Sequence, residues 1–287
     1  MQPEELRQQG LEILVRNNTI TFYNPFIVYT SGKIGPYKVD CGTLLKNPRD
    51  ITKAAELLAF LYREMESQGQ SPTTRITGGE SIDWIFSNRV AENINISAAM
   101  LYKDGHVRGA DLKDHIITHI ADVNSEGSSI IYLWRPLIHK QGALLKQTLF
   151  FVERCERGKE LLAEKIITSR AVVELDSYTW SRLSDMKAIT YQEYGEVCLY
   201  RENRESWANN NLRSDAGLAH LAELLTSEKA SFQQRAHTLL MRGYPDLAEE
   251  LMQTLINRQF IKPEQAQVVV ESMMKGLAHS KRIEKFE

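Results

Sequence analysis

A polar turn rich in small residues follows a short apolar run near the middle of the chain. The stretch HIADVNSEGSS covers residues 119–129, and its last six residues are Asn124, Ser125, Glu126, Gly127, Ser128 and Ser129. Small side chains and backbone N–H groups at the start of a helix can surround a phosphate without a lysine. Asp122 would then face a ligand hydroxyl or a hydrated metal ion. An ordinary helix cap is the alternative, with Ser125 or Asn124 as the capping residue and Asp122 in solvent.

Two further segments carry residue types that suit an anionic ligand. A second glycine-rich turn, GGES, comprises Gly78, Gly79, Glu80 and Ser81. The segment KDGHVRGADLK at 103–113 gathers positive charge in Lys103, His106, Arg108 and Lys113. Such a loop could neutralise a polyphosphate leaving group, and a solvated basic loop is the alternative.

Helical and strand-like segments alternate between residues 45 and 185, which predicts an α/β domain with a parallel sheet covered by helices on both faces. The apolar spacing predicts helices at 50–66, 128–141 and 157–165, and a further helix after GGES. It predicts strands at 73–77, 96–102, 115–121, 146–152 and 170–175, with 103–114 as a polar loop. Ligands collect at the carboxyl ends of parallel strands, so both small-residue turns are expected at one edge of the sheet.

The flanking segments have a different character. Residues 26–42 are β-rich with glycine and proline breaks, which indicates a hairpin-like hood over about 17–45. Residues 207–217 are polar and linker-like, and the chain from 212 onward is helical in pattern, with breaks at 242–245 and 261–263. We therefore expect a domain at 1–204 and a C-terminal domain of three or four helices at 205–287. Its apolar residues are expected in the core, among them Leu239, Leu240, Leu247, Leu251 and Leu255.

Composition excludes several classes of protein. The chain has 35 Lys and Arg against 37 Asp and Glu, so we expect neither a nucleic acid nor a membrane as partner. The three cysteines, Cys41, Cys155 and Cys198, show no CxxC spacing, which argues against a disulfide framework and a zinc site. The first residues lack an apolar signal region, and no apolar stretch approaches the length of a membrane span, so we expect a cytoplasmic protein.

The usual hydrolase and nucleotide-binding motifs do not occur in the sequence. It contains no GxSxG, HExxH or GxxxxGK[ST] pattern, which leaves serine hydrolase, zinc protease and P-loop functions without support. His115 and His119 are four residues apart but fall on a predicted strand, so they lack the helical geometry of a metal pair. We interpret both as structural.

The order of the motifs resembles that of a known enzyme family. TSGKIGPYKVDCG, ITGGESIDW, LYKDGHVRG, HIADVNSEGSS and FFVERCERGKELLAEKIITSRAVVELD follow one another as in the orotate phosphoribosyltransferases, over roughly residues 10 to 185. This resemblance implies the type I phosphoribosyltransferase fold. It also implies transfer of a 5-phosphoribosyl group from phosphoribosyl pyrophosphate to orotate with magnesium, in pyrimidine nucleotide biosynthesis, by a homodimer.

The resemblance assigns a role to each motif. It implies that Asp122 holds the ribose hydroxyls, Ser125 to Ser129 hold the 5-phosphate, and Gly78 to Ser81 line the pyrophosphate. Lys103 and His106 would belong to a loop that closes over the site. The hood would cover the base through Ser31, Gly32, Lys33 and Tyr37.

Three positions depart from the family pattern. Ala121 stands where the family has the first of two adjacent acids, Tyr102 where it commonly has an arginine, and Asp83 where it has a glycine of the pyrophosphate turn. The segment from Tyr102 to Ala121 also looks shorter than the family's loop. The retained motifs favour an orotate phosphoribosyltransferase. The departures favour a catalytically impaired protein that binds a nucleotide or phosphoribosyl ligand in a regulatory or partner-binding role, and a structural subunit paired with an active homologue is a third reading.

Overall fold

The computed structural model describes residues 1–69, 73–262 and 264, and its contacts divide the chain into two compact units. The first unit consists of Met1–Thr21 and Val39–Ile189, and the second of Phe22–Lys38 and Thr190–Glu287. The predicted division at residue 204 differs from this one in two ways. The central part of the hood, Phe22–Lys38, joins the second unit, and the C-terminal part of this unit begins at Thr190 and not at residue 205.

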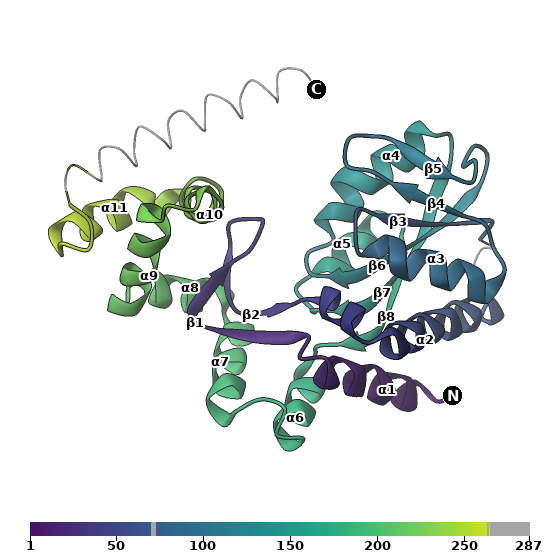
Figure 1. Ribbon diagram of the computed structural model, residues 1–287, viewed down its shortest axis with the longest axis horizontal. Helices are drawn as coiled ribbons and strands as arrows, with labels where there is room; N and C mark the ends of the chain where they lie inside the picture. The colour runs from purple at the N-terminus through teal and green to yellow at the C-terminus, as the bar shows by residue number, and fades with distance from the viewer. Residues whose placement is uncertain (70–72, 263, 265–287) are drawn as a thin grey trace. The chain divides into compact units, whose positions relative to one another are not determined.

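The first unit is built on a six-stranded sheet in the order β5-β4-β3-β6-β7-β8 (Figure 1). Neighbouring strands are parallel except for β5, which runs antiparallel to β4. The strands are β3 (Arg75–Gly79), β4 (Ala98–Leu101), β5 (Val107–Gly109), β6 (Ile116–Asn124), β7 (Leu144–Glu153) and β8 (Thr168–Glu174). The predicted α/β class and parallel sheet are confirmed, and β5 corrects the prediction of an irregular loop at 103–114.

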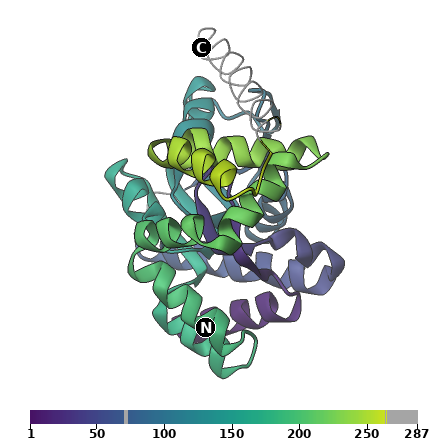
Figure 2. The same ribbon diagram turned by 90° about the vertical axis from the view of Figure 1, so that its left-hand side faces the viewer.

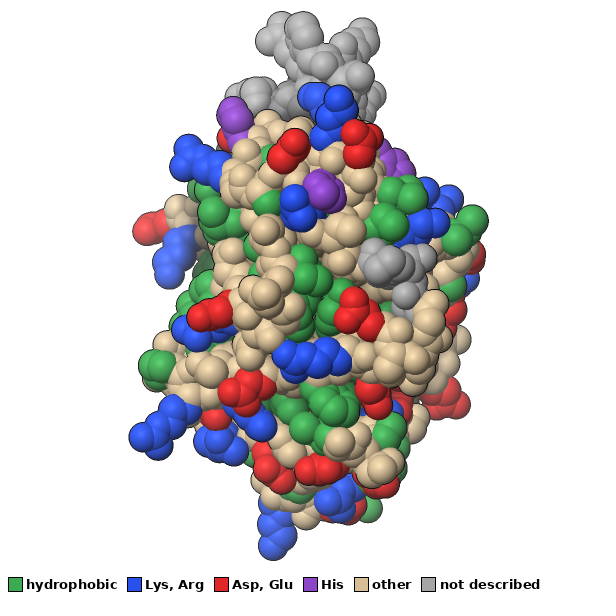
Figure 3. Space-filling view, turned by 90° about the vertical axis from the view of Figure 1, so that its right-hand side faces the viewer, with side chains coloured by type: hydrophobic (Ala, Val, Ile, Leu, Met, Phe, Trp, Pro, Cys, Tyr) green, Lys and Arg blue, Asp and Glu red, His purple; other side chains and the backbone are tan. Residues whose placement is uncertain are grey.

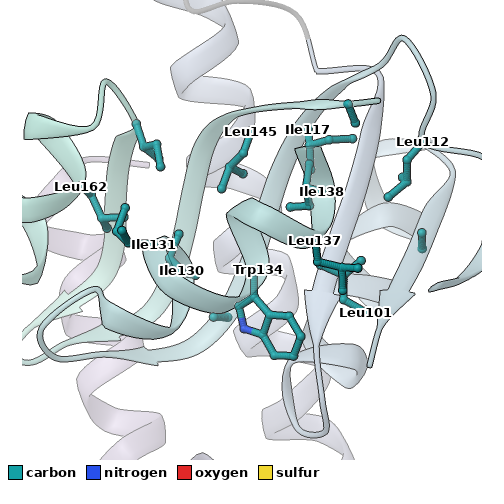
Figure 4. Close-up of a cluster of buried hydrophobic side chains, with 14 of the residues drawn as sticks. Leu101, Leu112, Ile117, Ile130, Ile131, Trp134, Leu137, Ile138, Leu145 and Leu162 are labelled. Carbon is teal, nitrogen blue, oxygen red and sulfur yellow. The ribbon is translucent and has the colours of Figure 1, made fainter. Parts of the chain in front are cut away.

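Helices cover both faces of this sheet. The helices of this unit are α1 (Pro3–Arg16), η1 (Cys41–Lys46), α2 (Pro48–Ser67), α3 (Asp83–Ile94), η2 (Ile130–Trp134), α4 (Arg135–Lys140), α5 (Gly158–Glu164) and α6 (Ser177–Asp185), of which α1 to α5 contact the strands. On one face, η2, α4 and α5 press apolar side chains onto β4, β6 and β7, and Figure 4 shows Trp134 within this cluster. Burial of such a cluster is the main favourable term that holds the helices on the sheet. The carboxyl ends of the parallel strands are thereby presented at one edge.

The second unit combines the hood with helices from the end of the chain. The hood is a two-stranded sheet of β1 (Ile20–Val28) and β2 (Ile34–Val39). The remaining elements are α7 (Tyr191–Glu202), α8 (Arg204–Arg213), α9 (Asp215–Thr226), α10 (Ala230–Thr238), η3 (Leu239–Gly243), η4 (Pro245–Leu247) and α11 (Ala248–Asn257), shown in green to yellow in Figure 2. The predicted hairpin and helical tail are confirmed for the described residues, and Pro263 and residues 265–287 lie outside them.

The polar stretch at 207–217 is helical, contrary to the prediction of a linker. The Asn203 side chain accepts a hydrogen bond from the Ser206 amide at the start of α8, and the Ser214 hydroxyl accepts one from the Gly217 amide at the start of α9. These caps satisfy backbone donors at both helix starts. Trp207 and Leu212 are buried, which anchors α8 in spite of its polar composition.

The C-terminal apolar residues form a core, as predicted. Leu239, Leu240, Leu251 and Leu255 are buried, whereas Leu247 in η4 is only partly buried. In the same unit, the Phe26 ring of β1 packs edge to face against the His220 ring of α9, with ring centroids 5.1 Å apart. Such contacts explain why the hood and the helical tail form one unit.

The molecular surface shows no gathering of one charge on the face drawn in Figure 3, where basic and acidic side chains are interspersed. Within the described residues, no helix combines the length and apolar character needed to cross a membrane.

Candidate functional site

The carboxyl edge of the first unit's sheet holds two aspartates in contact. Asp122 lies near the end of β6, and Asp83 lies in the first turn of α3. The Asp83 Oδ1 accepts a hydrogen bond from the Asp122 amide at 2.9 Å, and the two carboxyl groups lie close enough for each to influence the pKa of the other. Asp122 also accepts a hydrogen bond from the Val123 amide at 2.7 Å. The predicted ribose-binding residue is therefore paired with a carboxyl group from a different element.

The surroundings of this pair are acidic. Burial and then the Asp122 carboxylate raise the pKa of Asp83 well above its ordinary value, and burial raises the pKa of Asp122, with Asp40 adding to the effect. The thiol of Cys41 is buried, and burial followed by Asp122, Asp40 and Asp83 raises its pKa. Two carboxyl groups in contact favour one shared proton, because two negative charges at this distance repel each other.

The two glycines of the predicted glycine-rich turn are the last residues of β3, and they pack against the protein itself. A Cβ added at Gly79 would overlap the Trp134 indole, and one added at Gly78 would overlap the Ser87 hydroxyl and approach the Asp83 carbonyl oxygen. Glycine is required at both positions for this internal packing. On its far side the Trp134 ring stacks on His119, with centroids 6.1 Å apart. Glu80 and Ser81 follow in an exposed turn.

The predicted closing loop is a tight hairpin turn between β4 and β5. The Tyr102 amide donates to the His106 carbonyl at 2.9 Å, and Gly105 has a φ of +90°. Lys103 and His106 are exposed, and the Lys103 amide donates to the Glu80 carboxylate at 3.1 Å. The structure thus brings Lys103 beside the glycine-rich turn.

Aromatic packing fixes one side of this hairpin. The Tyr102 ring lies against the Trp84 ring of α3, with centroids 4.6 Å apart, and the Arg108 guanidinium lies over Tyr102 at 5.5 Å. The Trp84 indole N–H also donates to the Leu101 carbonyl at 3.1 Å. Tyr102, in the place of the family's arginine, therefore acts as a packing residue that ties the hairpin to α3.

The turn after β6 keeps the features of a phosphate cradle. Gly127 has a φ of +72°, and Ser128 and Ser129 are exposed at the start of the helical segment that continues into η2. The first N–H groups of a helix have no acceptor within the helix. Asn124 is buried, and its Oδ1 accepts from the Gly127 amide at 3.1 Å, which shapes the turn from within. Asn124 thus holds the turn that precedes the helix, and the two serines are exposed.

A buried glutamate on the neighbouring strand holds this turn in place. Glu153 at the end of β7 is 2% exposed, and its carboxylate accepts from Asn124 Nδ2 at 2.6 Å and from the Cys155 amide at 2.9 Å. Burial raises the pKa of Glu153 to about 7, although both hydrogen bonds oppose the shift. Sequence reasoning missed Glu153, because only the pairing of β6 with β7 brings it to Asn124.

The four predicted base-binding residues lie in the second unit. Tyr37 is fully buried, with its ring 6.2 Å from that of Tyr200. Gly32 has a φ of +87° and packs closely against η3. Ser31 and Lys33 are exposed, with the Lys33 Nζ 4.6 Å above the Tyr244 ring. Tyr37 and Gly32 thus serve the core of this unit, and contact with a base stays a prediction that rests on Ser31 and Lys33.

A separate pocket of about 300 Å³ lies within the second unit. Its wall combines aromatic, proline, amide and acidic residues of the hood, α7 and α8: Phe22, Tyr23, Asn24, Pro25, Pro36, Thr190, Gln192, Glu193, Glu196 and Asn211. Glu193 closes the capping box of α7, and Glu196 accepts from the Trp207 indole at 3.0 Å. These carboxylates therefore have structural roles, and the predicted site did not include them.

Metal ligands are scarce in the part of the chain that the structure describes. No group of three or more His, Cys, Asp or Glu residues there is placed to hold a metal ion. Of the histidines predicted to be structural, His119 is buried and its Nδ1 lies 3.0 Å from the Thr77 hydroxyl, whereas His115 is partly buried and contacts the Thr74 hydroxyl at 3.0 Å.

Comparison with solved structures places the chain among proteins of one fold. UMP synthase from Leishmania donovani superposes with a TM-score of 0.59 at 20% identity, covering 67% of this chain and 41% of that one. Orotate phosphoribosyltransferase from Francisella tularensis superposes with a TM-score of 0.53 at 16% sequence identity. The match covers 67% of this chain and 96% of that one. Orotate phosphoribosyltransferase from Aeropyrum pernix superposes with a TM-score of 0.51 at 19% sequence identity. The match covers 61% of this chain and 98% of that one. This chain thus spans less than half the length of the UMP synthase.

No family model matches the sequence, and no curated protein matches it. The likeness is therefore one of fold. The mostly parallel six-stranded sheet with flanking helices is that of the phosphoribosyltransferase-like structures, which confirms the predicted fold class.

Proposed function

We propose that this chain binds a ligand with a 5-phosphoribosyl group at the carboxyl edge of the first unit's sheet, in a regulatory or partner-binding role. The observation that carries the proposal is the turn after β6, where Gly127 has a positive φ and Ser128 and Ser129 are exposed at a helix start. Backbone N–H groups at a helix start suit a phosphate. The adjacent Asp122 would accept hydrogen bonds from ribose hydroxyls.

Transfer of the phosphoribosyl group to a base is the second candidate function. It would take phosphoribosyl pyrophosphate and orotate or a related base, and it is favoured by the placement of Lys103 beside Glu80 in the glycine-rich turn. The neighbours of known fold are named as orotate phosphoribosyltransferases and a UMP synthase. Magnesium, as the resemblance implies, would neutralise the charge of the ligand's phosphates. The homodimer and the cytoplasmic location stay predictions.

Two measurements separate these functions. Calorimetric titration with ribose 5-phosphate should show saturable binding, and Asp122→Asn should weaken it by at least several-fold without lowering the melting temperature. Asp114→Asn, at an exposed position outside the proposed site, should bind like the wild type. Release of pyrophosphate from a mixture of phosphoribosyl pyrophosphate, orotate and magnesium would establish the transferase. Absence of ribose 5-phosphate binding would refute the first function.

A further inference from the structure

Two carboxylates line the pocket of the second unit. Glu193 and Glu196 of α7 are three positions apart, so their side chains lie on one face of the helix. Both are partly buried, and neither forms an ion pair with any described residue. In the same unit, by contrast, Glu250 of α11 pairs with Arg213 at 2.6 Å. Among the described residues that line the pocket, none is a lysine or an arginine. The pocket therefore repels anions and favours a cation.

Each of these glutamates uses one carboxylate oxygen within the protein. The Glu193 Oε2 accepts from the Thr190 amide at 2.7 Å and from the Thr190 hydroxyl at 2.9 Å. The Glu196 Oε2 accepts from the Trp207 indole N–H at 3.0 Å. No described residue donates a hydrogen bond to the Oε1 atom of either side chain. The internal hydrogen bonds thus hold both carboxylates in place and leave one acceptor oxygen on each without a bond from the described chain.

The rest of the wall suits an aliphatic chain that carries N–H donors. Its apolar surface comes from aromatic and proline side chains of the hood: Phe22, Tyr23, Pro25 and Pro36. Aromatic rings attract ammonium groups, and the prolines can pack against methylenes. The Asn211 Nδ2 already donates to the Trp207 carbonyl at 3.0 Å, so its Oδ1 is the atom that can accept from a ligand. The volume of about 300 Å³ is at the lower end for small-molecule sites, which favours a small ligand.

Other kinds of ligand match these groups less well. A divalent metal ion of the calcium type takes about six or more oxygen ligands. Within the described part of the chain, no three His, Cys, Asp or Glu side chains are grouped to supply them. A phosphate would meet two carboxylates and no cation, and a neutral base would leave both charges uncompensated. A ligand with two cationic groups joined by methylenes matches the carboxylates, the apolar wall and the volume together.

We propose that this pocket binds a small aliphatic polyamine. One ammonium group would contact Glu193 and another Glu196, and the methylene chain between them would lie against the aromatic and proline side chains. The inference concerns the second unit alone. No residue of the pocket belongs to the proposed phosphoribosyl site, so the failure of one proposal leaves the other standing.

Calorimetric titration of the full chain with spermidine at moderate salt tests the proposal. The wild type should show one saturable site, and octane-1,8-diol, a neutral chain of the same length, should not bind. Glu193→Gln and Glu196→Gln keep an oxygen for their partners in the protein and remove the charge. Each should weaken spermidine binding about tenfold, since each removes a charge-assisted hydrogen bond. Glu202→Gln, at the exposed last residue of α7 outside the pocket, is the matched control and should bind within about twofold of the wild type.

Several results would overturn the polyamine site. One is the absence of saturable spermidine binding to the wild type. Another is equal weakening by Glu202→Gln, because the binding would then be a general effect of surface charge. Displacement of spermidine by magnesium at equal concentration would show that any small cation suffices, and equally tight binding of octane-1,8-diol would show that the glutamates play no part. Thermal melts establish that each variant is folded. Should one variant unfold, the other variant and the ratio of spermidine to diol affinity in the wild type still decide.

Discussion

Glu153 gives the fold a pH dependence that follows from its surroundings. Its carboxylate is 2% exposed, and burial raises its pKa from an ordinary 4.5 to about 7. The folded state therefore holds the proton more tightly than the unfolded chain does. The resulting stabilisation is fully present below the unfolded pKa and is lost as the pH rises through the folded one. The difference between the two pKa values corresponds to about 3 kcal/mol of unfolding free energy.

Denaturant unfolding at about pH 5 and about pH 8 measures this effect, since those values bracket most of the titration. Glu153→Gln removes the titration, so the wild type should lose about 2 to 3 kcal/mol more than this variant between the two pH values. Glu160→Gln, an exposed glutamate in the first turn of α5, is the matched control and should follow the wild type. Parallel pH profiles for the wild type and Glu153→Gln would contradict this prediction, because Glu153 would then have the same pKa in the folded and unfolded states.

Three further predictions concern His119, the glycine turn and the assembly state. Burial lowers the pKa of His119 to about 3, so its stabilising contribution is present above the unfolded pKa and is lost as the pH falls. Between about pH 6.5 and pH 4, the wild type should lose about 3 kcal/mol more unfolding free energy than His119→Gln does, as measured by denaturant unfolding. Gly79→Ala should lower stability by about 1 to 3 kcal/mol, because its Cβ would overlap Trp134. Gly195→Ala within α7, where a Cβ meets open space, should be neutral or stabilising by up to about 1 kcal/mol in thermal melts. If the chain is a homodimer, sedimentation should give about twice 32.9 kDa, and a monomer would contradict that prediction.

The parallel sheet was predictable because short segments rich in apolar residues alternate with longer segments that have helical apolar spacing. The β4–β5 hairpin was missed although the sequence carries its signal, since Asp104-Gly105 is a dipeptide that favours tight hairpin turns. The helix α8 was missed because its composition is polar, and its caps at Asn203 and Ser214 were not weighed against that composition. In the β4–β5 hairpin and in α8, the turn and capping residues determine the secondary structure more than the average polarity of the segment does.

The position of the candidate site could be predicted from the sequence, but the contacts of its side chains could not. Both small-residue turns lie at the carboxyl ends of strands, as the alternation of elements implied. The pairing of Asp83 with Asp122 joins residues 39 positions apart and depends on how α3 packs beside β6. The hydrogen bond from the Ile34 amide to the Tyr244 hydroxyl joins residues 210 positions apart. Local sequence patterns therefore could not predict that the hood packs with the C-terminal helices. Sequence spacing specified the turns, whereas tertiary packing decided which groups occupy them.

A 5-phosphate bound beside Asp122 would lie against the turn after β6. The most direct test follows the backbone amide signals of isotopically labelled protein by nuclear magnetic resonance during titration with ribose 5-phosphate. We expect the amide signals of Ser125, Gly127, Ser128 and Ser129 to shift together along one saturation curve, and that of Asp122 to shift with them. If ribose 5-phosphate leaves these amides unchanged at saturating concentration, or shifts only residues of the second unit's pocket, the phosphoribosyl site is not where we place it.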